Sequence, residues 1–193
     1  DAGSITGSST CGITCGGVIT DSGTLAITGD ATFTNTSGSN DAITLDDASN
    51  AFAGTVTFAT DSGSAVTIVD TTSLDLKALS AASLSVTAGG AVTDSGTLAI
   101  SGATTLNSGS ADLTLDQSAS TFGTLAITGA NVAVTENAAM DLGASTISGT
   151  ASFNSTSNAI TDSGTLAITG ATTLNSGSAD LTLDEAASTF GPL

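Results

Sequence analysis

Short segments in which apolar residues alternate with small polar or small apolar residues recur along the whole chain. Examples are Leu98-Ala99-Ile100, Leu113-Thr114-Leu115 and Val132-Ala133-Val134, each followed within a few residues by Gly, Asn, Asp or Ser. A period of two predicts β-strands, and the residues that interrupt it predict turns. Strands this short cannot bury a face as isolated hairpins. We therefore expect the chain to coil, so that each strand pairs with the coils above and below it.

A near-exact internal duplication is the strongest signal in the sequence. Residues 93–123 read TDSGTLAISGATTLNSGSADLTLDQSASTFG, and residues 161–191 read TDSGTLAITGATTLNSGSADLTLDEAASTFG, an offset of 68 positions. A looser copy begins at Asp21. Self-similarity of this kind is the signature of repeat architectures. It predicts one repeat domain over residues 1–193, with internal units at about 21–93 and 94–161 and a partial unit at 162–193.

These patterns predict an all-β fold, a single-stranded parallel β-helix or β-solenoid. Coils of roughly 20–24 residues divide the 68-residue unit into about three and the chain into about eight to ten. At about 4.8 Å per coil the rod is some 40–45 Å long. The alternative fold is a short sandwich of antiparallel sheets. In the solenoid we expect the six phenylalanines to stack inward; they are Phe33, Phe52, Phe58, Phe122, Phe153 and Phe190.

Composition narrows the possible functions. The chain has 18 acidic residues and one basic residue, Lys77, a net charge of −17, and no His, Trp or Tyr. A mean hydropathy of +0.35 indicates a folded protein despite the many Gly and Ser residues. Such a charge repels phosphate backbones, which argues against nucleic acid as a partner. No apolar run approaches the roughly 18 residues that a membrane span needs, so we expect no membrane insertion.

The same composition argues against an enzyme. Solenoid enzymes that cleave acidic polysaccharides need Arg or Lys to hold the substrate, and Lys77 is best explained as a surface residue. A glycosidase with two carboxylates on adjacent coils is formally possible, but no aromatic sugar-binding residues accompany them. The sequence therefore predicts neither catalytic residues nor a cofactor.

The two cysteines, Cys11 and Cys15, lie in the segment CGITCGG. Without histidine a zinc or haem site lacks its remaining ligands. A local disulfide is one reading, and it requires a tight turn, since four residues of extended chain hold the Cα atoms beyond bonding range. An intermolecular crosslink and two buried free thiols are the other readings.

Two binding activities need consideration. Asp41, Asp46 and Asp47 form the densest acidic cluster and are weak candidates for loosely bound calcium, although no calcium-binding loop motif occurs. Solvated turn acids are the plainer interpretation. Thr32-Phe33-Thr34 and Thr55-Val56-Thr57 could present hydroxyls as ice-binding solenoids do, but the Thr-x-Thr motif does not recur once per coil.

Residues 95–123, SGTLAISGATTLNSGSADLTLDQSASTFG, and the segment that follows them resemble the β-helical repeats of filamentous-haemagglutinin-type exoproteins, large secreted adhesins of Gram-negative bacteria. This resemblance implies a right-handed parallel β-helix at the bacterial cell surface and brings no catalytic residues with it. This chain is much shorter than such adhesins.

We therefore expect a non-enzymatic extracellular structural protein. An uncapped solenoid end is a template for another copy, so the first hypothesis is head-to-tail assembly into a surface filament. The second is a stalk segment of a large adhesin that contacts a host or neighbouring cell surface, and the third is an ice-binding solenoid.

Overall fold

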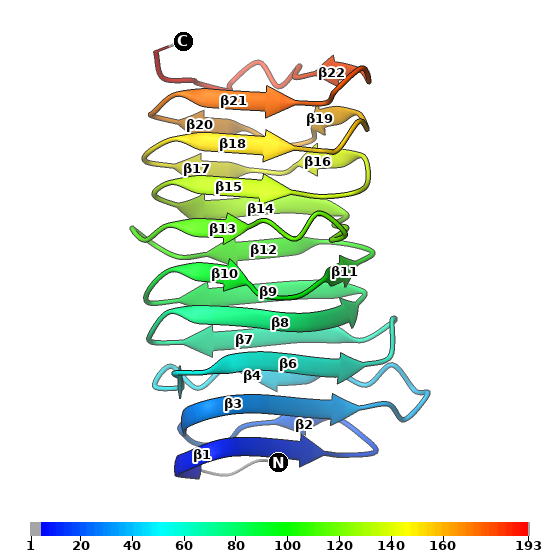
Figure 1. The fold of residues 1–193 in the computed structure, drawn as a ribbon, viewed down its shortest axis with the longest axis vertical. Coiled ribbons are helices and arrows are strands. Elements are labelled where there is room, and N and C mark those ends of the chain that lie inside the picture. Colours follow the sequence, from blue (N-terminus) through cyan, green and yellow to red (C-terminus); the bar gives the residue numbers. More distant parts are fainter. Residues whose placement is uncertain (1–4, 193) are drawn as a thin grey trace.

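The computed structural model describes residues 5–192, which form one rod of stacked coils (Figure 1). It is an all-β parallel solenoid of about nine turns, with no helix among the described residues. Every strand pairing among them is parallel, so the predicted β-solenoid is confirmed and the antiparallel sandwich is excluded; one example is Val92, which pairs with Leu74 on one side and Leu113 on the other.

Two sheets of eleven strands each run along the rod. The first sheet contains β1 (Ile5–Thr14), β3 (Leu25–Asn35), β5 (Ala51–Phe52), β6 (Thr55–Thr60), β8 (Leu74–Ala81), β10 (Val92–Asp94), β11 (Leu98–Ile100), β13 (Leu113–Leu115), β15 (Val132–Thr135), β18 (Ala151–Asn154) and β21 (Thr172–Asn175). The second contains β2 (Ile19–Thr20), β4 (Ile43–Leu45), β7 (Ala65–Asp70), β9 (Ser83–Ala88), β12 (Thr104–Asn107), β14 (Thr124–Gly129), β16 (Met140–Leu142), β17 (Ser145–Ile147), β19 (Ile160–Asp162), β20 (Leu166–Ile168) and β22 (Leu181–Thr182).

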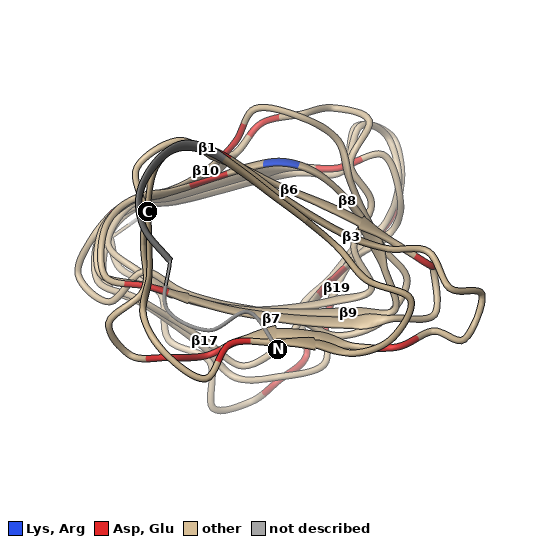
Figure 2. Ribbon diagram, turned by 90° about the horizontal axis from the view of Figure 1, so that it is seen from below, with Lys and Arg blue, Asp and Glu red and all other residues tan. Residues whose placement is uncertain are grey.

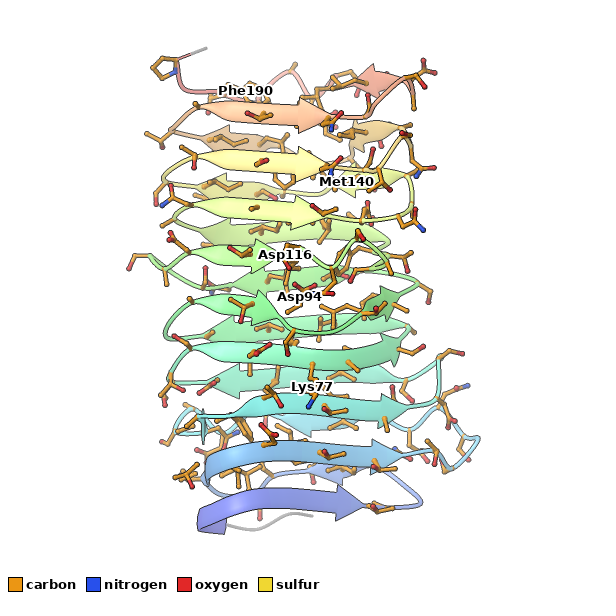
Figure 3. The ribbon with its side chains drawn as sticks, in the orientation of Figure 1. Lys77, Asp94, Asp116, Met140 and Phe190 are labelled. Carbon is orange, nitrogen blue, oxygen red and sulfur yellow. The ribbon has the colours of Figure 1, made fainter. Side chains whose placement is uncertain are left out.

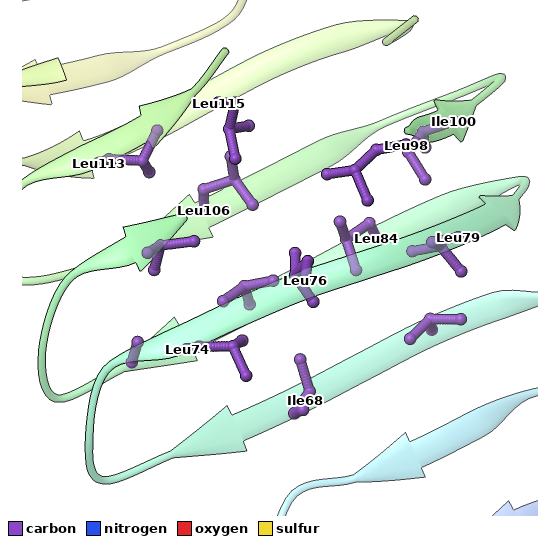
Figure 4. Close-up of a cluster of buried hydrophobic side chains, with 14 of the residues drawn as sticks. Ile68, Leu74, Leu76, Leu79, Leu84, Leu98, Ile100, Leu106, Leu113 and Leu115 are labelled. Atoms are coloured by element: carbon purple, nitrogen blue, oxygen red, sulfur yellow. The ribbon is translucent and has the colours of Figure 1, made fainter. Parts of the chain in front are cut away.

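The alternating residues place one continuous apolar core between the sheets (Figure 4). Phe33 stacks on Phe58 with ring centroids 5.7 Å apart and meets the edge of Phe52 at 6.1 Å. Five of the six phenylalanines are buried as expected. The expectation was wrong for Phe190, which is 38 % exposed because it lies on the last described coil, where nothing covers it.

The 68-residue unit spans three and a half coils rather than the three we expected. Strand β10 lies in the first sheet, whereas its copy β19 lies in the second, half a coil beyond β18. The reason is coil length: Ala151 pairs with Thr172, so this coil takes 21 residues, and three such coils fall short of 68. Equivalent residues of these two copies therefore face opposite sides of the rod.

The corners between the sheets explain the recurring Asp-Ser-Gly motif. Its aspartates accept a backbone N–H from the following coil: Asp94 from Asp116 at 2.8 Å (Figure 3) and Asp162 from Asp184 at 2.8 Å. Asp21 accepts the N–H of Asp46 in the same way. Buried N–H groups that lack a ladder partner need such acceptors. The motif is thus a connection between coils.

A second corner position repeats in all three units. Asn50 accepts the N–H of Leu25 at 2.8 Å, Ser120 that of Leu98 at 3.0 Å, and Ser188 that of Leu166 at 3.0 Å. The side chain thus satisfies the first N–H of a strand one coil earlier. Viewed along the axis of the rod, acidic residues are distributed around its perimeter (Figure 2). Lys77 is exposed on β8, as expected.

The glycine of the motif is required by close packing between coils. A Cβ atom on Gly96 would lie 1.4 Å from the carbonyl oxygen of Lys77. We predict that Gly96→Ala lowers the free energy of unfolding by about 1–3 kcal/mol, because the backbone must shift to admit a methyl group. Denaturant unfolding followed by circular dichroism measures this. Gly12→Ala is the control, since its Cβ would meet nothing within 4 Å, and equal effects from both variants would contradict the packing.

Candidate functional site

The two ends of the rod are the candidate site, because strand edges are open there. Within residues 5–192, β1 and β2 pair on one side only, with β3 and β4, and β21 and β22 likewise pair only with β18 and β19. These ends lie at opposite extremes of the rod (Figure 1). An open parallel edge presents backbone N–H and C=O groups that can pair with another strand.

Apolar side chains are exposed on the C-terminal coil. Leu181 is 46 % exposed, whereas its copy Leu113 is fully buried, and Phe190 is exposed while its copy Phe122 is 4 % exposed. An open hollow of about 310 Å³ on this coil is lined by Thr172, Leu174, Leu183 and Phe190. Their copies one unit earlier are all buried; they are Thr104, Leu106, Leu115 and Phe122. The C-terminal coil is therefore a core layer with one side uncovered.

The internal copy shows what covers such a layer. Leu125 and Ile127 of β14 lie over Thr104 and Leu106. Strand β15 lies over β13 in the same way. A β-coil with apolar residues at alternate inward positions therefore completes this layer.

In two units the N–H group at the phenylalanine position has a carboxyl acceptor on the next coil. Phe122 donates its N–H to Glu136 Oε2 at 2.8 Å, and Phe52 donates to Asp70 Oδ1 at 3.3 Å. Phe190 occupies the same place at the end of the rod (Figure 3), and the described chain has no coil beyond it to supply the acceptor. A partner that covers this end would meet this donor as well as the apolar hollow.

Glu136 is a buried carboxyl group that no motif in the sequence distinguishes. Its side chain has no exposed surface, and within the described residues Oε1 has no hydrogen-bond partner. Burial raises the pKa of Glu136 to about 8, and the hydrogen bond from the N–H of Phe122 acts in the opposite direction. Burial also raises the pKa of Asp70 and Asp94. Glu136 is consequently protonated at neutral pH.

The N-terminal coil carries both cysteines on its inward side. Cys11 is buried, and Ile13 and Cys15 pack partly buried against the core. The two thiols are free in the structure. Cys11 lies within β1, and an extended strand separates residues four apart by about 13 Å, beyond disulfide range. Of the three readings of the cysteines, this geometry favours free thiols or an intermolecular bond, and the predicted local disulfide stays a prediction.

The acidic residues proposed for calcium are spread along one coil. Asp41 precedes β4 and accepts the hydroxyl of Ser37, whereas Asp46 and Asp47 follow β4 and donate their N–H groups to Asp21. Among the described residues, no group of three potential metal-ligating side chains comes together. The calcium interpretation therefore gains no support from this geometry.

A shallow hollow on the side of the rod contains two carboxylates, Asp30 and Asp75. Asp30 accepts both the N–H of Thr55 at 3.0 Å and its hydroxyl at 2.9 Å. These hydrogen bonds lower the pKa of Asp30. This aspartate thus joins two coils, as the aspartates of the repeated motif do.

Comparison with known proteins gives a family but no activity. A model of repeats of unknown function (DUF5649) matches residues 1–59, 63–128 and 129–192. No curated protein and no solved structure matches the chain. No helix among the described residues is long and apolar enough to span a membrane. Because three consecutive matches cover nearly the whole sequence, the chain belongs to the DUF5649 family of repeats of unknown function.

Proposed function

We propose that this protein is a non-enzymatic extracellular structural subunit whose solenoids stack end to end into a filament on the bacterial cell surface. The observation that carries the proposal is the exposure of Leu181 and Phe190 on a coil whose internal copy is buried by the next coil. A contact between the C-terminal end of one rod and the N-terminal end of the next is heterologous. Because it does not close into a ring, it generates a fibre.

The chemistry of the remaining surface supports a structural role. The aspartates of the repeated motif accept backbone N–H groups between coils. An anionic substrate would need several basic residues to hold it, and the sequence has one, Lys77. The resemblance of the repeats to those of filamentous-haemagglutinin-type exoproteins supports the extracellular location. In that setting the chain needs no cofactor, and its partners are copies of itself and a host or neighbouring cell surface.

A stalk segment of a large adhesin is the alternative function, with the same fold and the end covered by further coils of the same polypeptide. Ice binding is the third. In its favour, outward residues Thr20, Thr44, Thr67, Ser85 and Thr105 form one hydroxyl ladder on the second sheet. Against it, the next residue in this ladder is Ala126.

Two measurements test the proposal. Light scattering of the purified 193-residue chain should show mass that grows with protein concentration to many times 18.3 kDa. Antibody labelling should be as strong on intact cells of the source organism as on lysed cells. A mass that stays at the monomer at every concentration would favour the stalk, and labelling only after lysis would exclude the extracellular role.

A further inference from the structure

We infer that the partner on the C-terminal coil is the N-terminal coil of a second copy, with β1 continuing the first sheet over β21 and β2 continuing the second sheet over β22. This inference rests on the proposed end-to-end assembly and specifies its register. In it, Cys11 lies over Thr172, Ile13 over Leu174, and Ile19 over Leu181.

The inward side chains of β1 match those that cover other coils. Cys11 and Ile13 pair with Ala31 and Phe33 inside their own copy. The pair Ala151 and Phe153 lies in the same manner against Thr172 and Leu174. In β1 and in β18, two inward residues at alternate positions face the neighbouring coil. The first of each pair is small, Cys11 or Ala151, and the second is large, Ile13 or Phe153. A second copy placed over β21 would extend this column of inward residues by one layer.

The number of residues that lead from the first sheet to the second also matches at the proposed junction. Cys11 and Ile19 are eight residues apart, as are Val132 and Met140. Val132 pairs with Ala151 and Met140 with Ile160, which are nine residues apart. An eight-residue corner therefore already pairs with a nine-residue corner within the chain.

The exposed end has that nine-residue corner. Thr172 and Leu181 are nine residues apart, and they pair with Ala151 and Ile160 of the coil below. The eight-residue step from Cys11 to Ile19 of a second copy thus fits across this corner, because an eight-residue corner already pairs with a nine-residue corner within the chain.

The corner of the N-terminal coil has the same backbone hydrogen bonds as the coil of β15 and β16. The N–H of Cys15 donates to Thr34 O at 3.0 Å, as that of Glu136 donates to Asn154 O at 2.9 Å. The N–H of Ile19 donates to Ala42 O, as that of Met140 donates to Ala159 O. At this corner, from Cys15 to Ile19, the N-terminal coil is thus built like an interior coil.

Charge does not oppose this contact from the N-terminal side. Residues 5–20 contain no charged side chain, in a chain whose net charge is −17. The C-terminal coil contributes Asp180, Asp184 and Glu185, all exposed. Repulsion between like charges at the junction is therefore limited to the corner after β2, where Asp21 directly follows Thr20.

The native cysteines allow a direct test of the register. In a Cys15→Ser background, Thr172→Cys places a thiol opposite Cys11 of the next copy, at the separation of paired strands, which suits a disulfide. Leu181→Cys is the matched variant, opposite Ile19. After mild oxidation of assembled protein, non-reducing gels should show a ladder of covalent oligomers for Thr172→Cys and at least tenfold less crosslinking for Leu181→Cys.

Each other outcome overturns the inference in a recognisable way. Crosslinking of Leu181→Cys but not Thr172→Cys would mean a rod rotated by half a turn. Fibres without crosslinks in either variant would mean a different interface, with the filament itself retained. The absence of assembly in both variants and in the unmodified chain would instead remove the proposed function. Ile13→Cys with Leu174→Cys, in a chain lacking both native cysteines, repeats the test if Thr172→Cys does not fold.

Discussion

Leu181→Asp is expected to abolish end-to-end assembly and to leave the fold of the rod unchanged. Leu181 is exposed on the last coil, so an aspartate there stays hydrated in the isolated subunit and costs little stability. In the filament the same aspartate would be buried between two core layers without a partner, which is strongly unfavourable. Light scattering should show loss of all species larger than the monomer, and circular dichroism should show an unchanged unfolding midpoint.

Leu113→Asp is the matched control, because Leu113 is the same residue of the preceding unit and is fully buried. The substitution that is harmless at the end should there lower the free energy of unfolding by more than about 4 kcal/mol or prevent folding. If Leu181→Asp still forms fibres, the C-terminal coil is not the interface. If it unfolds as Leu113→Asp does, residue 181 is not the exposed position that the structure shows.

Glu136→Gln is expected to stabilise the protein at alkaline pH and to have little effect at acid pH. The pKa of Glu136 is about 8 in the folded chain and near 4.5 when unfolded, so between these values the folded state binds the extra proton. Stability from this group is therefore fully present below about pH 4.5 and is lost as the pH rises through 8. Glutamine stays neutral and can still accept the N–H of Phe122 through its amide oxygen.

The expected gain is about 1–3 kcal/mol at pH 9, less than the roughly 5 kcal/mol equivalent of the full shift, because the corner can relax and admit water around the charge. Urea unfolding at pH 4.5 and pH 9 measures it. Glu185→Gln, an exposed position on the last coil, controls for the change in net charge. Equal gains from the two variants at pH 9 would mean that general repulsion among the acids, rather than burial of Glu136, sets the pH dependence.

Much of the fold could be predicted from the sequence because its pattern is repeated. Alternation such as that of Leu113-Thr114-Leu115 predicted the strands, their shortness predicted that the chain coils, and the duplication at 68 residues predicted one repeat domain. The predicted number of coils per unit was wrong, because the 68-residue offset gives only the length of the repeat. It does not give the number of residues in each corner. The half coil that places β10 and β19 in different sheets depends on corner geometry that composition does not encode.

The candidate site was only partly visible in the sequence. Open solenoid ends were expected from the repeat architecture. All six phenylalanines were expected to lie inside, however, so the exposure of Phe190 and Leu181 on the last described coil was not predicted. Glu136 could not be found, since an isolated acid in Thr-Glu-Asn has no pattern that distinguishes a buried corner from a solvated turn. Asp41 and Asp46 are close in the sequence, but they lie on either side of β4. Closeness in sequence therefore did not predict closeness in space.

Cryo-electron microscopy of the concentrated protein tests the central claim most directly. The account predicts unbranched fibres in which coils follow one another at about 4.8 Å and the subunit repeats after nine coils, at about 43 Å along the axis. The junction should appear as one more coil step, without a gap in the core density. Separate rods of about that length at high concentration, or fibres joined through their sides, would contradict it.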